Sequence, residues 1–60
     1  METELQKALK LYLANNPGSE RELADELRVS IDTLKLWLKG TNLPHLEIAR
    51  VIIDYLKSKS

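Results

Sequence analysis

The stretch ERELADELRVSIDTLKLWLKGTNLP, residues 20–44, contains two short helical patterns with very little chain between them. Ser19 precedes the first pattern, and Glu22 follows three residues later, a spacing typical of a capping box at a helix start. Ser30 is a second predicted N-cap, directly before the second pattern. Gly40 suits the left-handed position that ends a helix. The stretch therefore predicts two helices with defined ends.

Apolar residues recur on one side of both helices. Leu23, Ala24 and Leu27 face inward from the first helix, and the small Ala24 lets another backbone approach closely. The second helix is predicted over Ile31–Lys39. Its core-facing arc consists of Ile31, Leu34, Trp37 and Leu38, and we expect the tryptophan to be largely buried. Val29 fills the joint. Two short helices joined by about three residues predict a helix-turn-helix arrangement.

Two further helices flank this pair. Helical spacing predicts one over Thr3–Asn15, and the Pro and Gly of Asn15–Gly18 end it. The other is predicted over His45–Lys57, with Pro44 in its first turn, where the missing N–H is tolerated. No strand-like alternation is present. We expect an all-α fold, a small bundle of four or five helices, in which residues 1–60 form one domain.

The composition excludes several classes of protein. The chain has 60 residues, no Cys, and nine basic residues balanced by nine acidic ones. We therefore expect no disulfide framework and no thiolate metal site, and the composition suits the cytoplasm. No stretch is apolar for long enough to span a membrane, and the N-terminus lacks the features of a signal peptide. Zero net charge gives no general attraction to nucleic acid, although the distribution of charge matters more.

No constellation predicts catalysis. His45 is the only histidine, and a position in the first turn of a helix explains it without a chemical role. The acidic pairs Glu20/Glu22 and Asp25/Glu26 lie on a helix whose outer side should be charged. A domain this small has little room for a cleft. We expect no enzyme activity, no metal, no cofactor and no small-molecule substrate.

The outer face of the helix over Ile31–Lys39 carries Asp32, Lys35, Leu36 and Lys39, with Thr33 at its edge. We expect Leu36 to be exposed there. An isolated exposed leucine is ordinary, so a solvated surface explains this face as well as a binding function does.

The stretch over residues 20–44 resembles the helix-turn-helix of the Cro/C1 family of phage repressors, also called the XRE family. The match runs through Leu23, Ala24, Leu27, Val29, Ser30, Leu34, Trp37, Gly40 and Pro44, and it covers about residues 19–56. The resemblance implies a lambda-repressor-like fold and a transcriptional regulator, a Cro-like repressor, that binds double-stranded operator DNA. Its third helix would lie in the major groove.

The resemblance also implies roles for individual residues. Asp32, Thr33 and Leu36 would contact base edges, Asp32 by accepting from a cytosine amino group. Phosphates would be met by the backbone at Ser19 and Ser30 and by the side chains of Arg21, Lys35, Lys39, Thr41 and Asn42. The chain departs from the family at Arg28, where the family usually has Gly in the turn, and at Glu20, where it often has an amide.

The helix over His45–Lys57 is apolar over more than half of its circumference, which exceeds what one face of a small bundle requires. Ile48, Val51 and Tyr55 form the excess strip. It predicts a homodimer interface, since paired half-sites multiply specificity. The alternative is that the helix over Thr3–Asn15 covers part of the strip.

Three functions remain open from the sequence. The first is a DNA-binding repressor of phage or prophage type. The second is a protein-interaction module on the same fold without DNA binding, favoured by Leu36, Asp32, Glu20 and the zero net charge. The third is a scaffold with no partner.

Overall fold

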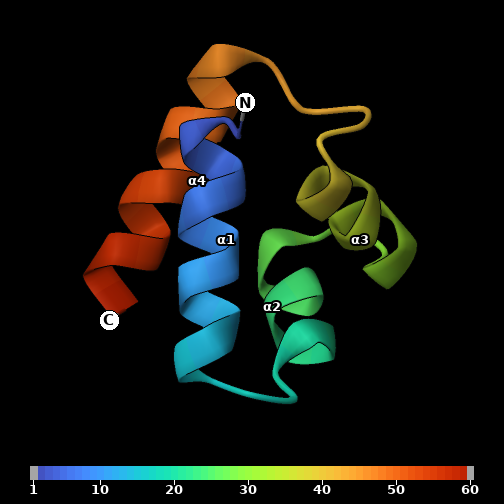
Figure 1. The fold of residues 1–60 in the computed structure, drawn as a ribbon, viewed down its shortest axis with the longest axis vertical. Coiled ribbons are helices and arrows are strands. Elements are labelled where there is room, and N and C mark those ends of the chain that lie inside the picture. Colours follow the sequence, from blue (N-terminus) through green and yellow to red (C-terminus); the bar gives the residue numbers. More distant parts are fainter. Residues whose placement is uncertain (1, 60) are drawn as a thin grey trace.

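The computed structural model of the chain describes residues 2–59, so residues 1 and 60 of the predicted domain lie outside it. It contains four helices: α1 (Glu4–Asn15), α2 (Glu20–Leu27), α3 (Ile31–Lys39) and α4 (Leu46–Lys59) (Figure 1). The predicted all-α bundle is confirmed, with four helices rather than five and no strand within residues 2–59.

The first helix is fixed at its start by a reciprocal pair of hydrogen bonds. The Thr3 hydroxyl accepts from the Gln6 backbone N–H at 3.2 Å, and the Gln6 side-chain oxygen accepts from the Thr3 N–H at 2.9 Å. Thr3 is therefore the N-cap, and α1 begins at Glu4. The buried Gln6 amide also donates to the Leu38 carbonyl of α3 at 3.3 Å, which ties α1 to the end of α3.

The capping box predicted at Ser19 is wrong. Ser19 has φ −98° and ψ 12°, outside the extended conformation that an N-cap usually adopts, and its side chain caps no N–H of α2. Its hydroxyl donates instead to the Asn16 carbonyl at 2.6 Å. Gly18 precedes it at φ 80°, and the tight loop formed there turns the Ser19 hydroxyl back toward the end of α1.

Both α2 and α3 end in the same pair of backbone hydrogen bonds. After α2, the Val29 N–H donates to the Ala24 carbonyl and the Arg28 N–H donates to the Asp25 carbonyl. After α3, the Thr41 N–H donates to the Leu36 carbonyl and the Gly40 N–H donates to the Trp37 carbonyl. Residues Arg28 and Gly40 are left-handed, at φ 60° and φ 86°. These are Schellman ends, and the one after α2 leaves only a short turn before Ser30 caps α3.

The bounds of α4 differ slightly from the prediction. Its first residue is Leu46. The His45 carbonyl accepts the first helical hydrogen bond, from the Ala49 N–H, so His45 is the residue that flanks the start of the helix. Pro44 therefore precedes the helix, and is not in its first turn. The helix also continues past Lys57 to Lys59.

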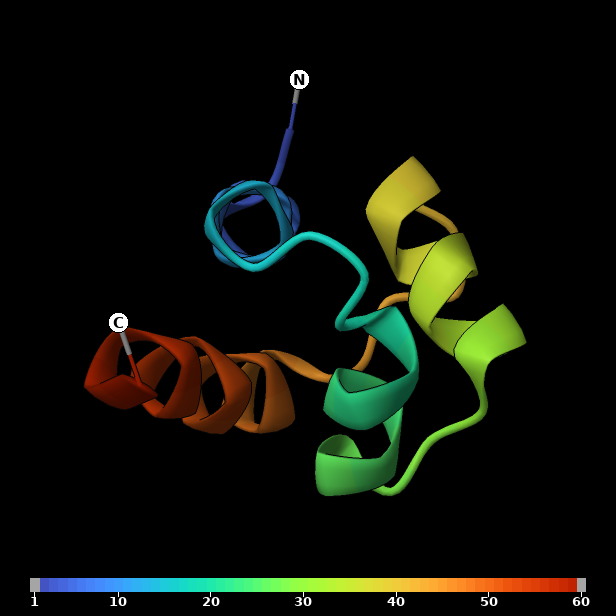
Figure 2. The same cartoon turned by 90° about the horizontal axis from the view of Figure 1, so that it is seen from below.

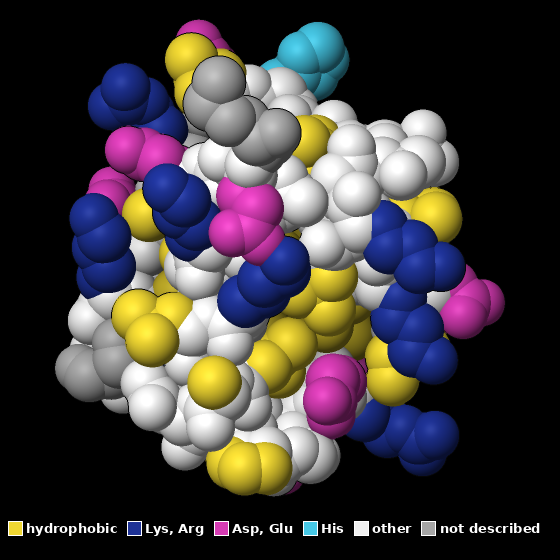
Figure 3. Space-filling view, in the orientation of Figure 1, with side chains coloured by type: hydrophobic (Ala, Val, Ile, Leu, Met, Phe, Trp, Pro, Cys, Tyr) yellow, Lys and Arg dark blue, Asp and Glu magenta, His cyan; other side chains and the backbone are white. Residues whose placement is uncertain are grey.

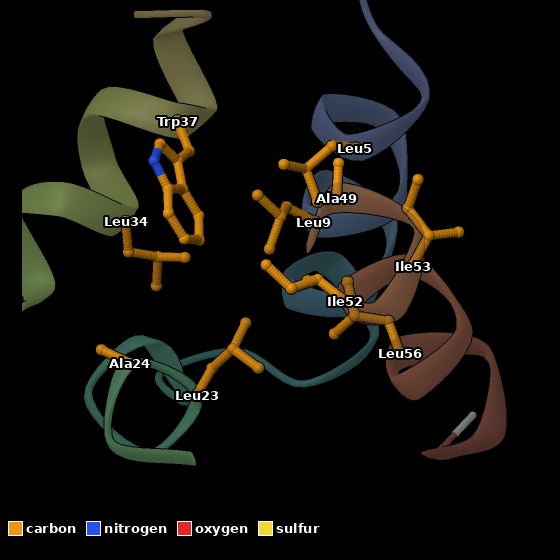
Figure 4. Packing of buried hydrophobic residues seen from close by; sticks show 10 residues of the cluster. All are labelled: Leu5, Leu9, Leu23, Ala24, Leu34, Trp37, Ala49, Ile52, Ile53 and Leu56. Carbon is orange, nitrogen blue, oxygen red and sulfur yellow. The ribbon is translucent and has the colours of Figure 1, made fainter. Parts of the chain in front are cut away.

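The core lies where α1 meets α4 on one side and the α2–α3 pair on the other (Figures 1 and 2). Leu9, Leu23 and Leu34 are completely buried, and Trp37 is 6% exposed, as predicted. Figure 4 shows the buried residues converging from all four helices: Leu5, Leu9, Leu23, Ala24, Leu34, Trp37, Ala49, Ile52, Ile53 and Leu56. Within residues 2–59 no helix has both the length and the apolar character needed to cross a bilayer.

Candidate nucleic-acid interface

Helix α3 lies at the edge of the molecule, on the side away from α4 (Figure 2). Its inner side is anchored by the buried Leu34 and Trp37. The Trp37 indole N–H donates to the Asn42 carbonyl at 2.8 Å and so fixes the loop that follows α3. Asn42 is left-handed at φ 52°, a conformation that Asn tolerates better than most residues. The Trp37–Asn42 hydrogen bond therefore keeps α3 and the loop after it in a fixed position relative to each other.

The fully exposed residues of α3 between its caps are Asp32, Lys35 and Lys39. Within residues 2–59, neither lysine forms an ion pair; the described ion pairs are Lys10–Glu2 and Lys59–Glu26. Both ammonium groups are therefore available to a phosphate. Figure 3 shows Lys and Arg side chains gathered on the side of α3, with acidic side chains next to them, so the surface there is basic but mixed.

The prediction that Leu36 is exposed is wrong, because Leu36 is only partly accessible. On the helical wheel Leu36 and Thr33 lie three residues apart on one flank of α3, next to the buried Trp37. Thr33 is partly buried as well. Base contacts by these two residues would come from the edge of the helix, and the centre of the outer face belongs to the charged residues.

The start of α3 uses most of its side-chain hydrogen-bonding capacity internally. The Ser30 hydroxyl accepts from the Thr33 backbone N–H at 3.1 Å and lies 2.8 Å from the Thr33 hydroxyl. This confirms Ser30 as an N-cap. The Ser30 cap leaves the N–H groups of Ile31 and Asp32, which begin the helix, for an outside acceptor. The Asp32 carboxylate beside them opposes a phosphate at this point.

The remaining residues predicted to contact phosphate are Ser19 and Arg21 at the start of α2 and Thr41 and Asn42 after α3. The Ser19 backbone N–H donates to the Asn16 carbonyl at 3.3 Å, so the predicted use of this N–H for phosphate conflicts with the geometry. Because the Ser19 side chain does not cap α2, the N–H groups of the first turn of α2 have no side-chain acceptor from Ser19. Arg21 is exposed in this turn, next to the partly buried Glu20. Thr41 and Asn42, beyond α3, are both exposed.

Arg28 is an exposed cation in the turn between α2 and α3, and sequence reasoning did not include it among the site residues. The sequence feature that could have identified Arg28 is a basic residue in the turn between two predicted helices, where glycine is favoured. With Arg21, Lys35 and Lys39, it adds a fourth exposed cation to the α2–α3 unit.

A second surface lies between α4 and the turn after α2. Ile48 and Val51, predicted for the dimer interface, are 52% and 68% exposed. They border a groove of about 510 Å³ that also contacts Leu27, Val29 and Trp37. Tyr55 lies at the same groove but is partly buried, and its hydroxyl donates to Glu26 of the same chain. The exposed part of the predicted strip is therefore Ile48 and Val51, and α1 does not cover it.

A polar cluster joins the ends of α2 and α4. The Lys59 ammonium group donates to both carboxylate oxygens of Glu26, at 2.7 and 2.6 Å. It also lies 5.8 Å from the ring centre of Tyr12 and 5.4 Å from that of Tyr55. The Lys59 ammonium and then the Tyr55 hydroxyl lower the pKa of Glu26, and Glu26 raises the pKa of both Tyr55 and Lys59.

Metal-binding capacity is absent from the described part of the chain: no group of three or more His, Cys, Asp or Glu residues is close enough to hold an ion. Comparison with protein-family models, with curated proteins and with solved structures found no significant match for this chain.

Proposed function

We propose that the chain is a small DNA-binding domain of a transcriptional regulator, of the Cro-like repressor type, which places α3 in the major groove of operator DNA. The observation that carries this proposal is the rigid α2–turn–α3 unit with four exposed cations, whose two lysines on α3 have no ion-pair partner within residues 2–59. We further propose that it acts in the cytoplasm.

In this function the cations position the domain and a smaller set of side chains reads bases. Lys35 and Lys39 lie one helical turn apart on the outer face of α3 and would contact phosphates, while Asp32, one turn before Lys35 on the same face, would contact a base edge. Asp32 accepts hydrogen bonds only, which favours the amino group of cytosine. Because the net charge is zero, attraction to DNA comes from this one face and falls steeply with salt.

A homodimer belongs to the same proposal. The domain measures 24 × 23 × 22 Å. Two copies in contact through the Ile48–Val51 groove would have to place their α3 helices about 34 Å apart, one turn of DNA, to reach two half-sites. Such spacing lets two weak half-site contacts act together.

The test is selection of sequences from a random duplex library at fixed low salt, followed by titration of the selected duplex over a range of salt concentrations. Lys39→Ala should weaken binding to all sequences and reduce the slope of log K against log salt by about one unit. Lys10→Ala removes the same charge from α1, where Lys10 is paired with Glu2, and should leave the slope unchanged.

Failure of the parent protein to bind any duplex at low salt would exclude the DNA function, because phosphate attraction is strongest there. The alternative function is then a protein-interaction module on the same fold, and the exposed Ile48 and Val51 are the observation that favours it.

A further inference from the structure

A trough runs along the seam between α1 and α4, and at the start of these helices it is bordered by Leu43 and Pro44 of the loop between α3 and α4. It consists of hollows of about 440 and 250 Å³ that share Glu4 and Ile53. A smaller hollow of about 90 Å³ continues it past Leu11 toward the end of α1. Leu46 at one end and Leu11 farther along are 71% and 64% exposed, the former being the most exposed large apolar side chain described.

The shape of the trough matches a helix. Its lining on α1 extends from Thr3 to Asn15, and a helix of 12 residues is about 18 Å long. A docked helix of three turns would therefore follow it from end to end. Its floor is apolar, made by Leu5, Ile53 and Leu56. An apolar floor of this length suits apolar anchors spaced by three or four residues.

The charges along its rim are mainly positive. Lys7, Arg50 and Lys57 line it, against the single acidic side chain of Glu4. Figure 3 shows Lys and Arg side chains over α1 and α4, with some Asp and Glu side chains between them and hydrophobic side chains below. The groove beside Val51 differs, because its rim holds one acidic and one basic residue and is balanced.

We propose that this trough binds an amphipathic helix of a partner protein, with apolar residues seated on the floor and Asp or Glu residues facing the basic rim. A second copy of the chain fits less well, since a two-fold contact would bring two basic rims together. A membrane surface fits less well too, because the apolar atoms line a hollow. The proposal is independent of DNA binding, and the two surfaces can be occupied together.

The test uses a phage-displayed library of random peptides of about 16 residues, long enough for a helix that spans the trough. Selection is made on the intact domain. We expect enriched peptides to carry apolar residues at helical spacing with Asp or Glu beside them. Leu11→Glu should weaken the affinity for a synthetic copy of a selected peptide about tenfold or more. Lys7→Glu combined with Arg50→Glu should weaken it to a similar extent.

Ala14→Glu is the matched control, since Ala14 is exposed on the same helix as Leu11 and lines none of the hollows of the trough. It should retain the peptide. The circular dichroism and melting of Leu11→Glu should match those of the parent, because the substituted side chain is mostly solvated and lies one turn from Lys7.

The proposal is overturned if selection enriches no peptide, if the enriched peptides are basic, or if Leu11→Glu binds them as well as the parent does. Cosedimentation with phosphatidylserine vesicles that is lost in Leu11→Glu would also overturn it, in favour of a membrane surface. Loss of peptide binding in Leu11→Glu with DNA binding unchanged separates this proposal from the proposed function.

Discussion

Arg28 occupies a backbone conformation that favours glycine, with φ 60° and ψ 41°. Its N–H donates to Asp25, so the chain can reverse tightly between α2 and α3. A non-glycine residue there costs roughly 1–2 kcal/mol. The side chain is exposed, and no hydrogen bond or ion pair of Arg28's side chain occurs within residues 2–59 to offset that cost. Its positive charge in the α2–α3 turn is the feature that a glycine would lack.

Arg28→Gly should therefore stabilise the protein by about 1 kcal/mol, which raises the melting temperature by several degrees in a domain of this size. It should also weaken duplex binding at low salt, because one cation near the phosphates is lost. Arg28→Ala keeps the strained conformation and removes the same charge. It should weaken DNA binding equally without the gain in stability. Lower thermal stability of the glycine variant would contradict this account of the turn.

At the scale of helices, the ends of α2 and α4 are held together by Glu26, which binds both Lys59 and Tyr55. The side chains of Glu26 and Lys59 remain about one-third exposed, 34% and 31%, so solvent screens their attraction. The contact secures the last turn of α4 and keeps Tyr55 in place beside the groove.

Glu26→Gln should lower the melting temperature slightly at neutral pH, and the difference from the parent should disappear on acidification. The pKa of Glu26 is lowered in the folded protein, so its stabilising effect is present above the ordinary value of 4.5 and is lost as the pH falls through the lowered value. Thermal melts of both proteins from pH 7 to about pH 3 measure this. A constant difference across that range would show that Glu26 acts by shape and not by charge.

The helices and their order were predictable because periodicity and stop signals are local. The choice between the two possible capping boxes was not predictable from the sequence. Thr3 and Ser19 are both followed three residues later by a suitable partner, but only Thr3 has the extended backbone that a cap needs. At Ser19 the backbone conformation depends on the preceding loop, which contains the left-handed Gly18.

The candidate nucleic-acid interface was also predictable only in part. Lys35 and Lys39 on the outer face of α3 follow from the helical wheel. The partial burial of Leu36 does not, because the flank of a helix can be covered or open according to the packing around it. The Glu26–Lys59 contact joins residues 33 positions apart, and the register between two distant helices is absent from local patterns.

At the scale of the whole molecule, α3 and α4 carry two kinds of surface. The outer face of α3 is charged and carries the proposed DNA contacts, whereas α4 has exposed apolar side chains on two flanks, Leu46 on one and Ile48 with Val51 on the other. The flank with Ile48 and Val51 has balanced charges at its groove, from Glu26 and Arg28. Balanced charge and exposed apolar side chains are what an interface between two identical copies requires.

Val51→Lys should accordingly convert a dimer into a folded monomer, because it places a charge in the contact of each copy. Sedimentation equilibrium measures the change in mass, and the far-UV circular dichroism should be unaltered since Val51 is largely solvated. Leu46→Lys, at an equally exposed position on the other flank, is the control and should remain dimeric. A parent protein that is already monomeric at high concentration would refute the dimer.

The position of α4 in the chain also governs how the protein is made. Four of the ten buried apolar residues, Ala49, Ile52, Ile53 and Leu56, belong to this last described helix. While α4 is still inside the ribosomal exit tunnel, α1 lacks the helix that it packs against most extensively in the folded protein. The α2–α3 unit then has only part of its support, so cooperative folding must follow synthesis of α4. A newly made chain therefore acquires its supported α3 surface only after α4 has emerged.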